Sequence, residues 1–99
     1  MGKSEEAIRL GKLSVELDPM QTLSYLFLAN SLAGDGNFVE AISNLKKAQE
    51  ISNIQYPDLV PYHVLNHEIE EAIQENSKLS GEIHNFNEIL IQHELKNSA

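Results

Sequence analysis

Residues 22–55 decide the fold, and they read TLSYLFLANSLAGDGNFVEAISNLKKAQEISNIQ. Two apolar patterns of helical period stand on either side of the polar segment Gly34-Asp35-Gly36-Asn37. The two glycines permit the positive φ angles that a tight turn between helices needs. The stretch therefore predicts a helix over residues 21–33, a tight turn, and a second helix over residues 38–52.

The two predicted helices differ in how their apolar side chains are arranged. The first is apolar almost all round, which is typical of a helix packed on more than one side. The second carries one stripe, made of Phe38, Ala41, Ile42, Leu45, Ala48 and Ile51. Asn37 precedes this stripe and Glu40 follows three residues later. We expect the pair to cap the second helix in an asparagine version of the capping box.

Part of this pattern recurs 34 residues earlier, where Glu6-Ala7-Ile8 aligns with Glu40-Ala41-Ile42. We expect an earlier helix over residues 3–17, with Ser4 as its N-cap. Pro19 ends it, because a proline pushes the residue before it out of helical geometry. A period of 34 residues in helix–turn–helix units is typical of tetratricopeptide repeats.

Individual residues also resemble the tetratricopeptide repeat family. Its large, small and turn positions are matched by Tyr25, Leu28, Ala29, Leu32, Gly36, Phe38, Ala41, Leu45 and Ala48. Asn53 stands in place of the closing proline, and Gly11 and Ser14 replace a large residue and an alanine. The resemblance covers about one full repeat and half of another. It implies an all-α, solenoid-like fold over residues 1–55 that binds other proteins.

The resemblance also implies a binding face. In this family, ligand peptides lie along the face made by the first helix of each repeat, which here corresponds to Leu23, Leu26, Asn30 and Ala33. Some members grip a C-terminal carboxylate with an asparagine, but Phe27 stands at that position. We expect a protein or peptide partner on a mostly apolar patch. Alternatively, the chain's own C-terminal helix buries Leu23 and Leu26.

Residues 56–61 form a predicted linker that contains Pro57, Asp58 and Pro61. Asp58 favours a turn, and Pro61 suits the first position of the helix that follows. The letters EEAI return at Glu70–Ile73, but at an offset of 31 residues rather than 34. We interpret this return as a coincidence.

Residues 62–97 carry an apolar pattern with a period of 3.5 residues. Its seam consists of Leu65, Ile69, Ala72, Asn76, Leu79, Ile83, Phe86, Leu90 and His93. Such a seam predicts a long helix that forms a coiled coil with a second copy. Ser80-Gly81 interrupts the pattern, and a glycine inside a helix costs about 1 kcal/mol. Two antiparallel helices broken near residue 80, which cap the repeat or await another partner, are therefore an alternative.

Composition narrows the function further. The 99 residues carry a net charge of −8 and no cysteine. An acidic chain without a basic stripe is a poor ligand for nucleic acid or anionic membrane. The lack of cysteine excludes disulfides and thiolate metal sites. No run of about 18 apolar residues is present to span a membrane. The charged start MGKSEEAIRL lacks a signal-peptide core, so we expect a cytoplasmic protein.

Few residues point to chemistry. His63 and His67 are four apart, with Glu70 and Glu71 one turn further on, and this spacing can chelate a metal on a helix. Histidines on polar helix faces are common, however, and we expect neither a metal nor a cofactor. The chain has no phosphate-binding glycine loop and no nucleophile with a recognisable base, so we do not expect an enzyme.

The sequence thus favours a protein–protein interaction or assembly module of tetratricopeptide type, part of a scaffold or oligomer. One alternative is a structural oligomerisation element, with a homodimer formed through the C-terminal seam. A third is a helical metal-binding protein that uses His63 and His67.

Overall fold

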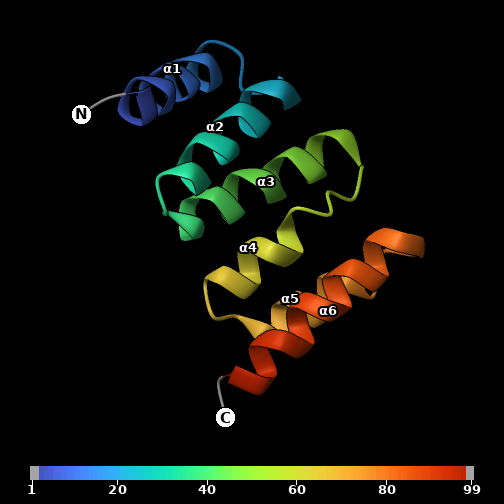
Figure 1. Ribbon diagram of the computed structural model, residues 1–99. Helices are drawn as coiled ribbons and strands as arrows, with labels where there is room; N and C mark the ends of the chain where they lie inside the picture. Colours follow the sequence, from blue (N-terminus) through green and yellow to red (C-terminus); the bar gives the residue numbers. More distant parts are fainter. Residues whose placement is uncertain (1–2, 98–99) are drawn as a thin grey trace. The chain divides into compact units, whose positions relative to one another are not determined.

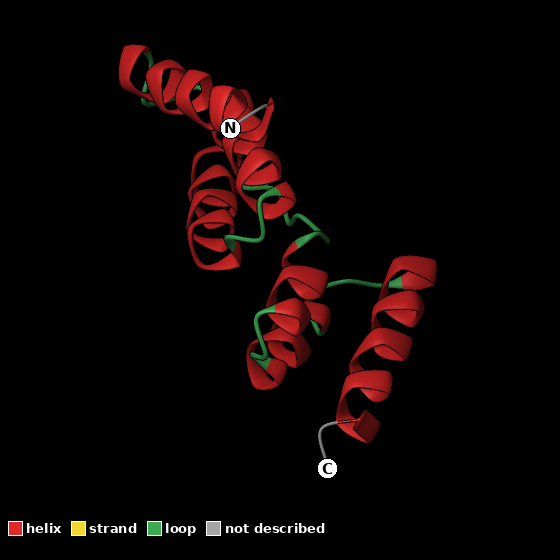
Figure 2. Cartoon of the chain, turned by 60° about the vertical axis from the view of Figure 1, so that its left-hand side comes forward, coloured by secondary structure: helices red, strands yellow, loops and turns green. Residues whose placement is uncertain are grey.

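The computed structural model describes residues 3–97, and residues 1 and 2 of the first predicted region lie outside them. The described residues form six α-helices and no strand (Figure 1, Figure 2). The all-α fold class predicted from the sequence is confirmed. The helices group into two compact units, which divide between Ile54 and Gln55. None of these helices is both long and apolar enough to cross a lipid bilayer.

The first unit contains α1 (Lys3–Leu17), α2 (Thr22–Gly34) and α3 (Phe38–Ser52). All three begin and end within one residue of their predicted ranges. α2 packs against both α1 and α3 (Figure 1). The core of the unit consists of Tyr25, Leu28, Ala29, Leu32, Ala41, Ile42, Leu45 and Ala48.

The turn between α2 and α3 has the conformation that its residues favour. Gly36 has a φ of 82°. Asn37 Oδ1 accepts the Glu40 backbone N–H, with 3.3 Å between the heavy atoms, and Asn37 Nδ2 donates to Glu40 Oε1 at 3.2 Å. The Asn37 backbone N–H already donates to the Leu32 carbonyl at 2.9 Å. The Glu40 carboxylate therefore accepts a hydrogen bond from the Asn37 side chain. In the predicted capping box it would accept one from the Asn37 backbone N–H.

Gly11 and Ser14 lie where α1 meets α2. A Cβ atom on Gly11 would stand 3.1 Å from Leu28 Cδ1 and 3.3 Å from Leu28 Cα, which leaves no room for a larger side chain. The Ser14 and Ser24 hydroxyls are hydrogen-bonded, with 2.6 Å between their oxygens. The close approach of α1 and α2 is the physical reason that small residues stand at these two positions.

Two helix ends differ from expectation. Ser4 lies inside α1, which begins at Lys3, so the prediction of Ser4 as N-cap is wrong. Asn53 ends α3 in the left-handed conformation, with a φ of 59°. Asparagine is one of the few residues that occupy this conformation readily. Asn53 can therefore end α3 without a proline or a glycine.

The second unit contains α4 (Leu59–Leu65), α5 (Ile69–Asn76) and α6 (Gly81–Asn97). Of the continuous and broken arrangements expected for residues 62–97, the structure has a broken one. The first break follows Leu65, where His67 has a φ of 61°, and the second precedes Gly81, which has a φ of 71°. The second break lies where the alternative of two helices placed it. Pro61 is the third residue of α4 rather than the first.

The three helices of the second unit share a small apolar core. It consists of Val60, Val64, Ala72 and Ile91, with Ile69 and Leu79 packed against it. Ala72 is fully buried, as is Ala41, and each lies in the second helix of a helix–turn–helix pair. The isoleucines that follow them differ, since Ile42 is buried and Ile73 is 47% exposed, so the interpretation of the returning EEAI as a coincidence stays a prediction.

Candidate functional site

The four residues of the predicted binding face all lie on α2. Leu23 is 70% exposed and Asn30 is exposed, while Leu26 and Ala33 are partly buried. Their spacing of 3, 4 and 3 residues places them along one side of the helix. The structure therefore brings the predicted set together on a single helix face.

Phe27 extends this surface, although the sequence analysis did not assign it to the face. It follows Leu23 by one helical turn and is 48% exposed. The spacing of four residues is a signal that could have identified it. In the repeats that the sequence resembles, an asparagine that binds a carboxylate stands at this position, so Phe27 was compared with that asparagine and not with the apolar residues of the face. We call the surface formed by Leu23, Leu26, Phe27, Asn30 and Ala33 the α2 face.

The α2 face carries no charge. The whole helix reads TLSYLFLANSLAG, without a single Asp, Glu, Lys or Arg. A partner that covers Leu23 and Phe27 would remove apolar surface from water without desolvating a charged group of α2. The Asn30 amide adds hydrogen-bonding atoms beside this apolar surface. The face suits the binding of an apolar peptide or helix.

The predicted oligomer seam is divided among three helices and a loop. Leu65 is the last residue of α4, and Ile69 and Asn76 are the first and last residues of α5. Leu79 lies in the loop before α6. The helix α6 carries the other three, Ile83, Phe86 and Leu90. Ile69 and Leu79 pack against the core of the unit. Asn76 is buried, and its Nδ2 donates to the His84 carbonyl at 3.2 Å. These residues therefore do not form one helical strip for a second copy.

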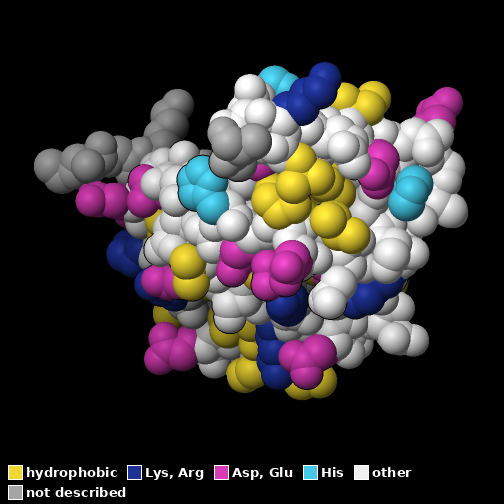
Figure 3. All heavy atoms as spheres, turned by 90° about the horizontal axis from the view of Figure 1, so that it is seen from below, with side chains coloured by type: hydrophobic (Ala, Val, Ile, Leu, Met, Phe, Trp, Pro, Cys, Tyr) yellow, Lys and Arg dark blue, Asp and Glu magenta, His cyan; other side chains and the backbone are white. Residues whose placement is uncertain are grey.

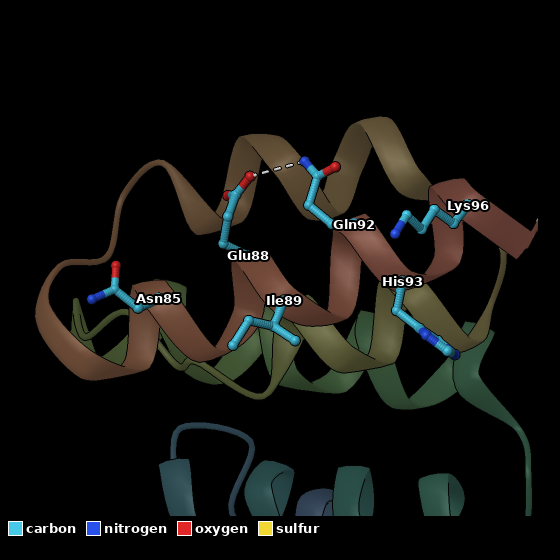
Figure 4. A pocket seen from close by; sticks show the side chains of 6 residues that line it. All are labelled: Asn85, Glu88, Ile89, Gln92, His93 and Lys96. Atoms are coloured by element: carbon cyan, nitrogen blue, oxygen red, sulfur yellow. Dashed lines mark hydrogen bonds between the residues drawn. The ribbon is translucent and has the colours of Figure 1, made fainter.

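A further surface lies on α6. An open hollow of about 520 Å³ is bordered by Asn85, Glu88, Ile89, Gln92, His93 and Lys96 (Figure 4). All six belong to α6, so the hollow is one helix face rather than a cleft between elements. Gln92 Nε2 donates to Glu88 Oε1 at 3.2 Å, and Asn97 Nδ2 donates to His93 Nε2 at 3.0 Å. Ile89 is the one hydrophobic side chain among the six, and the arrangement indicates no chemistry.

The two histidines proposed as a chelating pair do not share a helix. His63 is buried in α4, and its Nδ1 lies 3.0 Å from Glu68 Oε1. His67 lies beyond the end of α4 and has a positive φ. The spacing of one turn on a helix face, which chelation needed, is therefore missing. The described residues hold no group of three or more His, Cys, Asp or Glu side chains arranged to hold a metal ion.

Comparison with known proteins adds no further constraint, since family models, curated proteins and solved structures all gave no match.

Proposed function

We propose that this chain is a protein–protein interaction module of tetratricopeptide type, which binds a peptide or helix of another protein on the α2 face. The observation that carries the proposal is an uncharged helix that exposes Leu23 and Phe27 while its other sides pack against α1 and α3. In this proposal the chain acts in the cytoplasm by binding alone and catalyses no reaction.

The binding energy would come mainly from apolar burial. Fully burying a leucine or phenylalanine side chain contributes about 1.5–3 kcal/mol. Leu23 and Phe27 are both more than two-fifths exposed, so each has much of its surface still to bury. The Asn30 amide would bond to the backbone of a bound peptide and so fix its register.

Coiled-coil oligomerisation has less support. A coiled coil needs a seam that runs along one helix over several heptads. Here the breaks between α4, α5 and α6 interrupt that seam. Two of the seam residues, Ile69 and Leu79, pack against the core of their own unit.

The test starts with the selection of peptides that bind the intact chain from a random displayed library. The affinity of each selected peptide is then measured by fluorescence anisotropy for the wild-type chain and for Leu23→Gln. We expect Leu23→Gln to weaken binding at least tenfold, because it places a polar amide at a position that the bound peptide would bury. Val39→Gln is the matched control, since Val39 is 65% exposed on α3 and lies outside the face.

Equal affinity of the wild-type chain and Leu23→Gln for every selected peptide would rule out the α2 face. An equal loss in Leu23→Gln and Val39→Gln would point to a general change in the unit. In either case, the proposed function would fail.

A further inference from the structure

The second unit contains a hollow that is lined by residues of α4, of α6 and of the segment just before α4. Its volume is about 390 Å³, and it is lined by Pro57, Asp58, Pro61, Glu82, Ile83, Phe86 and Asn87. Pro61 belongs to α4, whereas Ile83 and Phe86 belong to the first half of α6. Pockets that bind ligands in proteins have volumes of about 300–1,000 Å³. The hollow is large enough for one or two apolar side chains.

Four of the seven lining residues are apolar, and two of these remain open to solvent. Phe86 is 61% exposed and Ile83 is also exposed. Pro57 and Pro61 line the same hollow. Proline rings are rigid, so they lose little conformational freedom when a ligand binds. This wall therefore suits an apolar side chain of a ligand.

Asn87 contributes a buried amide to the hollow. Its side chain is 3% exposed, and its Nδ2 atom is buried without a hydrogen-bond partner among the described residues. Nearly all buried polar groups in proteins are hydrogen-bonded, so an unpaired amide is an exception that calls for a partner. A half-turn of the amide exchanges its nitrogen and oxygen, so it can offer a donor or an acceptor to the hollow.

Two carboxylates stand at the edge of the hollow. Asp58 and Glu82 are both exposed, and within residues 3–97 neither side chain is paired with a cation. Residues 56–99 carry two Lys or Arg against eight Asp or Glu, and one of those two, Lys78, is paired with Glu75 at 2.6 Å. On the face drawn in Figure 3, both acidic and basic side chains lie around the hydrophobic ones. The local charge favours a cationic ligand and disfavours an anionic one.

We propose that this hollow is a second binding site, which takes an extended segment of a partner protein with one apolar side chain flanked by lysine or arginine. The apolar side chain fills the space between Pro61 and Phe86. The basic side chains pair with Asp58 and Glu82, and the Asn87 amide bonds to the backbone of the segment. This site shares no residue with the α2 face and does not depend on it.

The probe is the peptide acetyl-Gly-Lys-Leu-Lys-Gly-amide, titrated into the full ¹⁵N-labelled chain and followed by two-dimensional NMR. We expect saturable shifts of the Ile83, Phe86 and Asn87 backbone signals and of the Asn87 side-chain NH₂. Replacing both lysines of the peptide with glutamate, or its leucine with glycine, should weaken binding at least tenfold. Shifts spread evenly over acidic residues, or confined to the α2 face, would overturn the proposal.

Matched variants separate the hollow from general acidity. Phe86→Ala should weaken binding at least fivefold, whereas Ile89→Ala, which changes a 67% exposed residue of α6 outside this hollow, should not. The double variant Asp58→Asn/Glu82→Gln should weaken binding, and Glu70→Gln/Glu71→Gln, with the same change in charge, should not. If the two double variants bind equally, the site is refuted. Because all four carboxylates are exposed, these variants remain informative even if Phe86→Ala unfolds.

Discussion

At the scale of single residues, small side chains decide how closely the helices of this protein approach one another. Ala41 and Ala72 are fully buried in α3 and α5, and Gly11 is buried in α1 against Leu28. An alanine or glycine at such a position has so small a side chain that the two helix backbones can come into close contact. The apolar helical patterns mark Ala41 and Ala72, whereas Gly11 stands out only as a departure from the repeat pattern that the sequence resembles.

Gly11→Leu should destabilise the protein by about 1–3 kcal/mol, because the added atoms would collide with Leu28 and force α1 away from α2. The free energy of unfolding in urea, followed by circular dichroism, measures the effect. Gly34→Ala is the matched control, since a Cβ atom there meets nothing within 4 Å. If Gly11→Leu is as stable as the control, then α1 and α2 do not approach closely.

The Tyr62 hydroxyl should make the stability of the protein depend on pH in the alkaline range. Burial, and secondly the charge of Asp58, raise the pKa of Tyr62 above its usual value of about 10. The folded state therefore holds its proton more tightly than the unfolded state. The resulting stability is complete below a pH of about 10 and is lost as the pH rises through the higher pKa of the folded state.

Urea midpoints at pH 8 and at pH 11 test this dependence. The decrease between the two pH values should be smaller in Tyr62→Phe than in the wild-type chain. Tyr56→Phe is the control for the loss of one hydroxyl. An equal decrease in the wild-type chain and in Tyr62→Phe would show that Tyr62 does not contribute.

At the scale of elements, turn residues and apolar periodicity predicted the helix bounds correctly in the first unit but not in the second. The turn glycine Gly36 and the cap Asn37 agree with the apolar period on either side, so the bounds of α2 and α3 could be predicted. A period of 3.5 residues, by contrast, persists when separate helices pack around one core. The break after Leu65 was missed because Asn66 and His67 are weaker turn signals than glycine.

Gly81→Ala distinguishes a broken segment from a continuous helix by the sign of its effect. In the structure Gly81 has a φ of 71°, so an alanine there should cost about 1–2 kcal/mol. Inside a continuous helix the same change would stabilise by about 1 kcal/mol. Urea unfolding of the two chains gives the sign directly. Stabilisation by Gly81→Ala would contradict the break between α5 and α6.

At the scale of the whole molecule, only part of the candidate site could be predicted from the sequence. Leu23, Leu26, Asn30 and Ala33 share a face because they share a helix, and helical spacing is a local property. The hollow beside Phe86 depends on where α4 begins and on its contact with α6. Pro61 and Phe86 are 25 positions apart, and a contact between separate helices leaves no periodic signal in a single sequence.

The central claim is that this chain works by presenting the surfaces of folded helix pairs to other proteins, not by coiling with a second copy of itself. The most direct test is the solution mass of the chain, measured by light scattering behind a sizing column over a tenfold range of concentration. We predict a constant mass of 11.1 kDa, that of one chain. A mass that rises to twice this value would contradict the claim, because it would show that two copies of the chain associate.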